Sequence, residues 1–360
     1  MVKSPYPCFF AGAVTPDGFC SFFRDLYAPH GSTAAYLLKG GPGTGKSTLM
    51  HRLAEVGAAK GDPPELLLCS SDPDSLDGVR FSRGDLCVMD ATAPHVVEPQ
   101  FPGVCEVLVP LGEGFDLKKL RQNANAVRSL FAKNAALHAR VKRYIAAAGD
   151  LLLDTYTLAF SCTDLAKAQR YGAALAQRLL PARQTVGSTT RRFLSAVTPE
   201  GCVFLRDTLQ KTCDTLTVLE DVWGPASHAV LTAAAAKAVE LGHRVIVCPC
   251  PLSAAGKLEH LIFPDARVGL TVSGRYHKTQ AANRVIHATR FTDARALGAH
   301  RARIAFNRKS AARLLESAGS ILREANAVHR ELERYYIAAM DFSRSEEFFV
   351  RIKNDLLSRL

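Results

Sequence analysis

The chain has 360 residues, of which 48% are hydrophobic and 22% are charged, and its formal net charge is +11 at pH 7. This length suits about two domains, and the composition is that of a globular protein rather than a disordered or fibrous one. No run reaches the ~18 consecutive apolar residues of a membrane span, and the first residues carry no apolar export signal. We therefore expect a cytoplasmic protein with no membrane partner, whose ten cysteines are reduced.

A first helix is predicted directly after Thr15. Threonine is a favoured N-cap, proline fits the first helical position, and an acidic residue suits the positive end of a helix. Pro16 and Asp17 supply the latter two. Apolar residues then recur as far as Leu26 at the spacing of one helix face.

The next segment predicts a strand, a glycine-rich loop and a helix. An apolar run ends at Leu38, and apolar helix periodicity begins at Leu49. Between them lies a complete G-x-x-x-x-G-K-S motif, whose backbone N–H groups and following helix N-terminus surround phosphates. Lys46 would reach the β- and γ-phosphates, and the Ser47 hydroxyl would bind Mg²⁺. The predicted nucleotide-binding residues are Gly40, Gly41, Pro42, Gly43, Thr44, Gly45, Lys46, Ser47 and Thr48.

A second Mg²⁺ ligand is predicted at Asp90. Four apolar residues lead into this aspartate, as in the buried strands that carry the metal-associated aspartate of phosphate-loop enzymes. An ordinary strand ending in a capping aspartate is the alternative, and we favour the metal role. Ala91 follows, where ATPases of the additional-strand class often carry a water-polarising glutamate. The chain has no Asn-Lys-x-Asp guanine-reading motif, so we expect ATP rather than GTP.

Acidic residues after the next apolar run are candidates for positioning water. Asp72 and Asp74 lie in the segment 70–78, which follows a predicted strand. Strand carboxyl ends face the ligand crevice of open α/β sheets, although turn chemistry alone also accounts for these residues. His95 could sense the γ-phosphate or transfer a proton. A histidine at the matching place in the second half, His277, favours a shared structural hydrogen bond instead.

The chain contains an internal repeat. Residues 9–18 return as residues 193–201, and further positions match at offsets of 181 to 183. We also align residues 67–69 with residues 246–248. These matches predict an α/β fold of two tandem P-loop NTPase-like units, each with three αβα layers and a helical extension.

The second copy lacks the phosphate-binding residues. At this offset, the residues opposite Lys46, Ser47 and Asp90 are Ser227, His228 and Val272. Asp221 and its acidic neighbour would repel phosphates. We therefore expect one nucleotide site for each chain, in the first half.

The two halves end in helical extensions, at about 117–180 and 293–360. Small and polar residues at 181–190 indicate a linker, so we place the domains at 1–183 and 184–360. Both extensions are basic and could bind nucleic acid. We favour a solvated basic face, because aromatic residues are not interleaved with the charges.

With these motifs in place, the chain resembles a family of bacterial tandem P-loop ATPases. The resemblance rests on residues 9–18, 40–48, 71–78 and 90–95, and it covers most of both halves. It implies ATP binding and hydrolysis. The second half can also carry a phosphate loop in that family, and the chain departs from the family there.

The leading hypothesis is a Mg²⁺-dependent ATP hydrolase, with Lys46 and Asp90 as catalytic residues and Asp72 or Asp74 positioning water. The degenerate half would close or regulate the site, and Arg275 is a candidate arginine finger. One alternative is a small-molecule or nucleotide kinase, in which the acids would hold the acceptor. Another is a nucleotide-gated module that binds nucleic acid. The residues do not identify a second substrate or protein partner.

Overall fold

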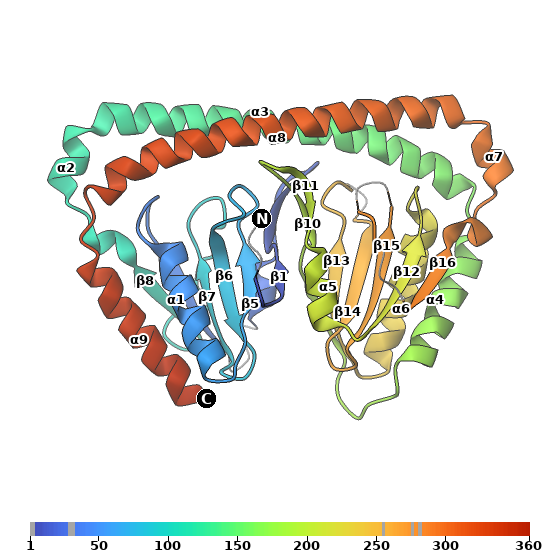
Figure 1. Ribbon diagram of the computed structural model, residues 1–360, viewed down its shortest axis with the longest axis horizontal. Coiled ribbons are helices and arrows are strands. Elements are labelled where there is room, and N and C mark those ends of the chain that lie inside the picture. Colours follow the sequence, from blue (N-terminus) through green and yellow to red (C-terminus); the bar gives the residue numbers. More distant parts are fainter. Residues whose placement is uncertain (1–3, 28–32, 254–255, 275–276, 280–282) are drawn as a thin grey trace.

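Each half of the chain forms a six-stranded sheet with helices packed against it, and two long helices span both sheets (Figure 1). This computed structural model describes residues 4–27, 33–253, 256–274, 277–279 and 283–360. The strands of the first sheet, in chain order, are β1 (Cys8–Phe9), β4 (Ala34–Lys39), β5 (Glu65–Leu68), β6 (Leu76–Phe81), β7 (Leu86–Asp90) and β8 (Glu106–Pro110). Those of the second are β9 (Ser188–Arg191), β12 (Thr215–Glu220), β13 (Arg244–Pro249), β14 (Leu258–Phe263), β15 (Val268–Ser273) and β16 (Arg284–His287).

The two sheets have the same topology, which confirms two repeated α/β units. Their strand orders are β1-β5-β6-β7-β4-β8 and β9-β13-β14-β15-β12-β16. In each sheet the third strand runs antiparallel to both neighbours, and the other pairs are parallel. Leu38 pairs with Asp90 in the first sheet, and Leu219 pairs with Val272 in the second. The predicted correspondence of Asp90 with Val272 is therefore confirmed.

One detail of the predicted register is wrong. We aligned Cys69 with Cys248, but β5 ends at Leu68 and β13 ends at Pro249. Each of these last residues pairs with the first residue of the following strand, just after an irregularity in the ladder. Cys69 therefore corresponds to Cys250. A short apolar run carries no sequence signal for the irregularity that shifts the pairing.

The predicted helix after Thr15 is also wrong, because the repeated segment forms a β-hairpin in both units. The hairpins are β2 (Gly12–Thr15) with β3 (Gly18–Ser21), and β10 (Ser195–Thr198) with β11 (Gly201–Phe204). The glycine after each turn has a positive φ, 114° at Gly18 and 99° at Gly201. Glycine adopts this conformation readily, and a continuing helix would not contain it. The Thr15 hydroxyl donates to the Gly18 carbonyl at 2.9 Å instead of capping a helix.

The two long helices, α3 (Ala124–Ser161) and α8 (Arg301–Ile337), lie side by side and form a roof over both units (Figure 1). They run antiparallel: Phe131 meets Tyr336 at one end, and Asp154 meets Arg303 at the other. The hairpins support the roof from below, since Val14 and Val197 belong to its hydrophobic cluster. At 38 residues, α3 is about 57 Å long, which lets it reach across both sheets.

Each helical extension ends on the opposite unit. Helix α4 (Leu165–Leu179) packs on α6 (Pro225–Glu240) of the second unit. Helix α9 (Ser343–Arg359) packs on α1 (Lys46–Ala59) of the first, beside the C-terminus in Figure 1. The two extensions are therefore exchanged between the units. The apolar face of α3 is unbroken and packs against α8, so the chain continues across to the other unit instead of folding back on its own.

The centre of the molecule joins equivalent residues of the two units. Phe10 and Phe193 exchange two backbone hydrogen bonds of 2.9 and 2.8 Å. Beside them, the buried guanidinium of Arg192 lies 2.5 Å from the Glu65 carboxylate. One hydrophobic cluster contains residues of both units, so the sheets are packed together as one body.

The remaining elements are short. They are the helices α2 (Leu117–Gln122), α5 (Arg206–Thr212) and α7 (Ala294–Gly298), and the 3₁₀ turns η1 (Phe23–Leu26), η2 (Leu111–Gly114) and η3 (Ala288–Phe291). Within the described ranges, none of the helices combines the length and the apolar character that crossing a membrane requires.

Candidate functional site

The predicted strand–loop–helix is present in the first unit. Strand β4 ends at Lys39, and α1 begins at Lys46. Between them, Gly43 and Gly45 have φ values of 66° and 81°, which turn the backbone as only glycine does without strain. The buried Thr44 hydroxyl donates to the Gly41 carbonyl at 2.9 Å and holds the loop closed on itself.

The structure brings Lys46 and Asp90 together at the end of the sheet. Because β4 and β7 are parallel neighbours, the loop after β4 and the last residue of β7 meet at the same edge. Lys46 Nζ lies 3.5 Å from Asp90 Oδ2, and both side chains are largely buried. The ammonium also donates to the carbonyls of Gly40 and Gly41, at 3.0 and 2.9 Å. The Lys46 side chain thus folds back onto the start of its own loop.

The oxygens predicted to bind Mg²⁺ fit that role. Asp90 Oδ1 accepts hydrogen bonds from the backbone N–H and the hydroxyl of Thr92. Its other oxygen, Oδ2, is the atom that faces Lys46. Ser47 is the second residue of α1, and its hydroxyl oxygen accepts from the Leu76 N–H at 3.0 Å. Hydroxyl and carboxylate oxygens are the hard ligands that Mg²⁺ prefers.

The predicted water-positioning acids occupy one turn but differ in their surroundings. Asp72 is half-buried and accepts from the Ser75 hydroxyl at 2.7 Å. It also accepts from Asn326 Nδ2 at 3.3 Å, which brings in α8 from the second half of the chain. Asp74 is exposed on the same turn. Sequence reasoning did not foresee Asn326, because nothing in a helix sequence shows which turn it will meet.

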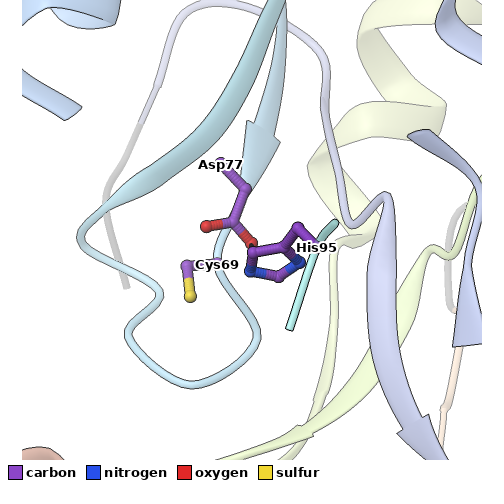
Figure 2. Close-up of side chains that lie close together, drawn as sticks. All are labelled: Cys69, Asp77 and His95. Atoms are coloured by element: carbon purple, nitrogen blue, oxygen red, sulfur yellow. Dashed lines mark ion pairs between the residues drawn. The ribbon is translucent and has the colours of Figure 1, made fainter. Parts of the chain in front are cut away.

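A third acid, Asp77, is buried beside Cys69 and His95 (Figure 2). Asp77 Oδ2 lies 3.3 Å from His95 Nε2. Burial raises the pKa of Asp77, the charge of His95 opposes this, and Asp90 and Lys46 are close enough to contribute. Burial also raises the pKa of the Cys69 thiol. This cluster therefore lies next to the loop lysine and the strand-end aspartate.

The His95 pair has a counterpart in the second unit. There, His277 Nε2 lies 2.9 Å from Glu259 Oε2, and both residues are buried. His95 and His277 thus each face a strand carboxylate, where we expected a shared structural hydrogen bond.

The end of α8 covers the phosphate loop. A Cβ on Gly41 would lie 3.1 Å from the Tyr336 ring, and one on Gly43 would lie 2.8 Å from Ile337 Cγ1. His329 lowers the pKa of Glu333, and a hydrogen bond from the Gly43 backbone and the charge of Lys46 lower it further. Glu333 of the second half thus lies close to Gly43 of the predicted phosphate loop.

The corresponding loop of the second unit is closed by its own carboxylate. Asp221 accepts from the backbone N–H groups of Trp223, Gly224 and Ser227, at 2.9, 2.9 and 2.8 Å. Helix α6 begins at Pro225, two positions before the residue aligned with Lys46, so the end of the loop is wound into the helix. The amide groups that would face a phosphate are therefore already occupied.

The sequence alignment of the two helix starts is consistent with the structure. His228 Nδ1 accepts from the Leu258 N–H at 3.0 Å. Ser47 accepts from the equivalent N–H, that of Leu76, at the same distance. His228 thus keeps the contact to the neighbouring strand, although its nitrogen replaces a hydroxyl oxygen that suits Mg²⁺.

A cavity lies over the strand ends of the second unit, below α3. Its lining includes Tyr156, Trp223, Cys250, Lys257, Glu259 and His277. Lys257 Nζ lies 3.0 Å from Glu259 Oε1. Burial raises the pKa of Glu259, but the charges of Lys257 and His277 outweigh it and lower the pKa to about 2. Arg275, the candidate arginine finger, lies outside the described residues.

The two basic segments lie at opposite ends of the roof. The first comprises α2 and the first part of α3, and the second includes the first part of α8. Because α3 and α8 are antiparallel, these parts lie apart rather than forming one patch (Figure 1). Arg303 of the second segment is paired with Asp154.

Comparisons of the chain with protein-family models, with curated proteins and with solved structures returned no match.

Proposed function

We propose that the first unit binds ATP with Mg²⁺ and hydrolyses it, and that the chain has one such site. The observation that carries this proposal is the Lys46 ammonium 3.5 Å from the Asp90 carboxylate, where a loop with positive-φ glycines meets a helix N-terminus. Phosphoryl transfer from a nucleoside triphosphate needs a cation, a metal-binding carboxylate and backbone amides at one place. The first unit supplies all three.

The residues of the loop would exchange partners when nucleotide binds. Lys46 Nζ would leave the carbonyls of Gly40 and Gly41 and donate to phosphate oxygens. Ser47 Oγ and Asp90 Oδ2 would hold Mg²⁺, which neutralises charge that develops on the phosphates. The backbone N–H of Gly43 would give up the Glu333 carboxylate.

We place the water-positioning role on Asp72 rather than Asp74. Asp72 is half-buried and oriented by Ser75 and Asn326, whereas Asp74 is exposed. An oriented carboxylate loses less freedom in the reaction than a mobile one. Since Asn326 belongs to α8, the second half of the chain would complete and close the site of the first.

Phosphate release from ATP, measured with and without Mg²⁺ and with no added acceptor, tests the proposal. Lys46→Ala should lower the rate by about 10²- to 10³-fold, the usual effect of losing a preorganised charge donor. Ser227→Ala is the matched control, since Ser227 is aligned with Lys46, and it should leave the rate unchanged.

Equal turnover by Lys46→Ala and the unaltered protein would contradict hydrolysis at this loop. A kinase would instead show release that is negligible until an acceptor is added. In that case Asp72 would face an acceptor hydroxyl rather than water.

A further inference from the structure

A set of cysteine, carboxylate and histidine, in which the acid and the histidine are buried, is present at equivalent places in both units. The cysteine directly follows a strand, and the acid is the second residue of the next strand. The histidine follows the strand beside that one. The two sets are Cys69, Asp77 and His95, and Cys250, Glu259 and His277. The second unit has lost the phosphate-binding residues but kept this set, so the set is not merely an accessory of the phosphate loop.

The side chains of the first set converge closely enough to share an ion (Figure 2). The candidate ligand atoms of Cys69, Asp77 and His95 all lie within 4.8 Å of one another. Asp77 and His95 are 4% and 7% exposed. Over the ranges that the structure describes, His95 Nδ1 has no hydrogen-bond partner, and Asp77 Oδ2 has none beyond its 3.3 Å ionic contact with His95 Nε2. Buried polar atoms without partners are unusual in folded proteins.

The donor types select the kind of ion. One sulfur, one imidazole nitrogen and one carboxylate oxygen suit Zn²⁺ and related divalent transition metals. Mg²⁺ prefers oxygen ligands alone, and it would therefore occupy Ser47 and Asp90 instead. Three protein ligands leave one tetrahedral position for water or substrate, as in catalytic rather than structural zinc sites.

The second set already contains a positive charge from the protein. Lys257 Nζ lies 3.0 Å from Glu259 Oε1, and the side chain is 20% exposed. The charge of Lys257 also acts on Cys250. The residue at the equivalent position of the first unit is Ser75, which is neutral and bonds to Asp72. The first set therefore has a neutral residue where the second has Lys257, and the charge of Lys46 affects the pKa of Asp77 less than those of His95 and Asp90 do.

We propose that Cys69, Asp77 and His95 form a binding site for one Zn²⁺-like transition-metal ion, and that Lys257 takes the place of that ion in the second unit. The site lies close enough to Lys46 and Asp90 for their charges to act on Asp77. It requires no nucleotide, so it is independent of the proposed ATPase activity.

Cobalt titration of the chelator-treated, tag-free full-length protein tests the site. Co²⁺ bound to a thiolate gives a sulfur-to-metal charge-transfer band and visible bands whose intensity reports four-coordination. One equivalent should bind, and Zn²⁺ should remove the bands. Cys69→Ser should abolish the charge-transfer band and weaken Co²⁺ binding at least about tenfold. Cys250→Ser, the matched change in the second unit, should leave both unchanged.

Three results would overturn the proposal: no charge-transfer band in the unaltered protein, a band that persists in Cys69→Ser, or a band lost equally in Cys250→Ser. Circular dichroism of each variant separates loss of the site from loss of the fold. Lys46→Ala should lose ATP turnover and keep the cobalt spectrum. The metal site and the ATPase proposal can therefore fail separately.

Lys257→Met tests the role of the second unit. Removal of the ammonium leaves the Glu259 carboxylate and Cys250 without their cation, so this variant should bind a second equivalent of Co²⁺. Zn²⁺ should also raise its melting temperature more than that of the unaltered protein. A stoichiometry that stays at one, with no added stabilisation, would show that Lys257 does not stand in for a metal ion.

Discussion

The two strand–loop–helix segments of this chain have the same connections but different contacts at the loop. Both loops join parallel strands of equivalent sheets to equivalent helices. In the first unit, Lys46 donates to two loop carbonyls. In the second, Asp221 accepts three loop N–H groups. Helix N-termini attract anions, and in the second unit the carboxylate of Asp221 already occupies that place.

The largest expected effect compares the two sheets at the edge that carries Asp90 in the first and Val272 in the second. Asp90→Asn should lower Mg²⁺-dependent ATP turnover about 10³-fold, because the neutral amide neither binds Mg²⁺ strongly nor balances Lys46. Ser273→Ala alters the same edge of the second sheet, beside Val272, and should leave turnover within about twofold. Steady-state phosphate release measures both. Comparable losses in the two variants would show that the sites do not differ as the structure indicates.

The next largest effect is on stability, and it concerns the loop of the second unit that Asp221 closes. Asp221→Ala leaves the N–H groups of Trp223, Gly224 and Ser227 without their charged acceptor, so stability should fall by about 3 kcal/mol. Urea unfolding measures this loss. Inorganic phosphate should stabilise the variant more than the unaltered protein, because the amides become available to an anion. Equal phosphate effects in the two proteins would mean that this loop is not a closed anion site.

A smaller effect is expected where the second half covers the first. Glu333 lies near Gly43 and Lys46, where its charge opposes that of a phosphate. Glu333→Gln should tighten ATP binding about three- to tenfold, since a nearby like charge is worth about 1 kcal/mol. Equilibrium titration with ATP and Mg²⁺ checks it. Glu331→Gln, at an exposed position of the same helix, controls for net charge and should have little effect.

The smallest expected effect is on stability, and it concerns the contacts between α3 and α8 at their two ends. Aromatic rings join α3 and α8 above the first unit, whereas Asp154 joins Arg303 and Asn307 above the second. Asp154→Asn should lower stability by about 0.5 kcal/mol, because the ion pair is largely exposed. Phe131→Ala tests the contribution of the aromatic contact at the other end of α3 and α8.

The Asp154 pair also predicts a pH dependence. Hydrogen bonds from Arg303 and Asn307 lower the pKa of Asp154 in the folded state. Its contribution is therefore present above the unfolded-state pKa of about 3.9 and is lost as the pH falls through the folded-state value. Urea unfolding measures the free energy of unfolding of Asp154→Asn and of the unaltered protein. The difference between the two should be smaller at acidic pH than at neutral pH. Asp150→Asn is the control, because Asp150 is an exposed acidic residue of the same helix.

Local sequence patterns were sufficient for several parts of the fold and site. Strand β4, the start of α1 and the correspondence of Asp90 with Val272 follow from apolar periodicity and the repeat. The turn after Thr15 shows where this reasoning fails. Thr-Pro-Asp suits both a helix start and a hairpin turn, and pairing with a second strand decided between them.

The cluster around Asp77 was partly within reach of the sequence. The repeat already related His95 to His277, but the two-residue error at Cys69 hid the third member. Strand pairing located that irregularity, because a ladder register depends on hydrogen bonds to a neighbouring strand. Asn326 and Glu333 had no local signal, since they reach the first unit only through the length and direction of α8.

The sequence by itself determined the phosphate-loop motif, the two α/β units and the absence of a lysine from the second loop. These features depend on residue type and on spacing over a few turns or strands. Tertiary structure alone decided that the extensions exchange units, that Asp221 fills the second loop, and that α8 covers the first. Such contacts join residues far apart in the chain, and only long-range packing and electrostatics select among their possible partners.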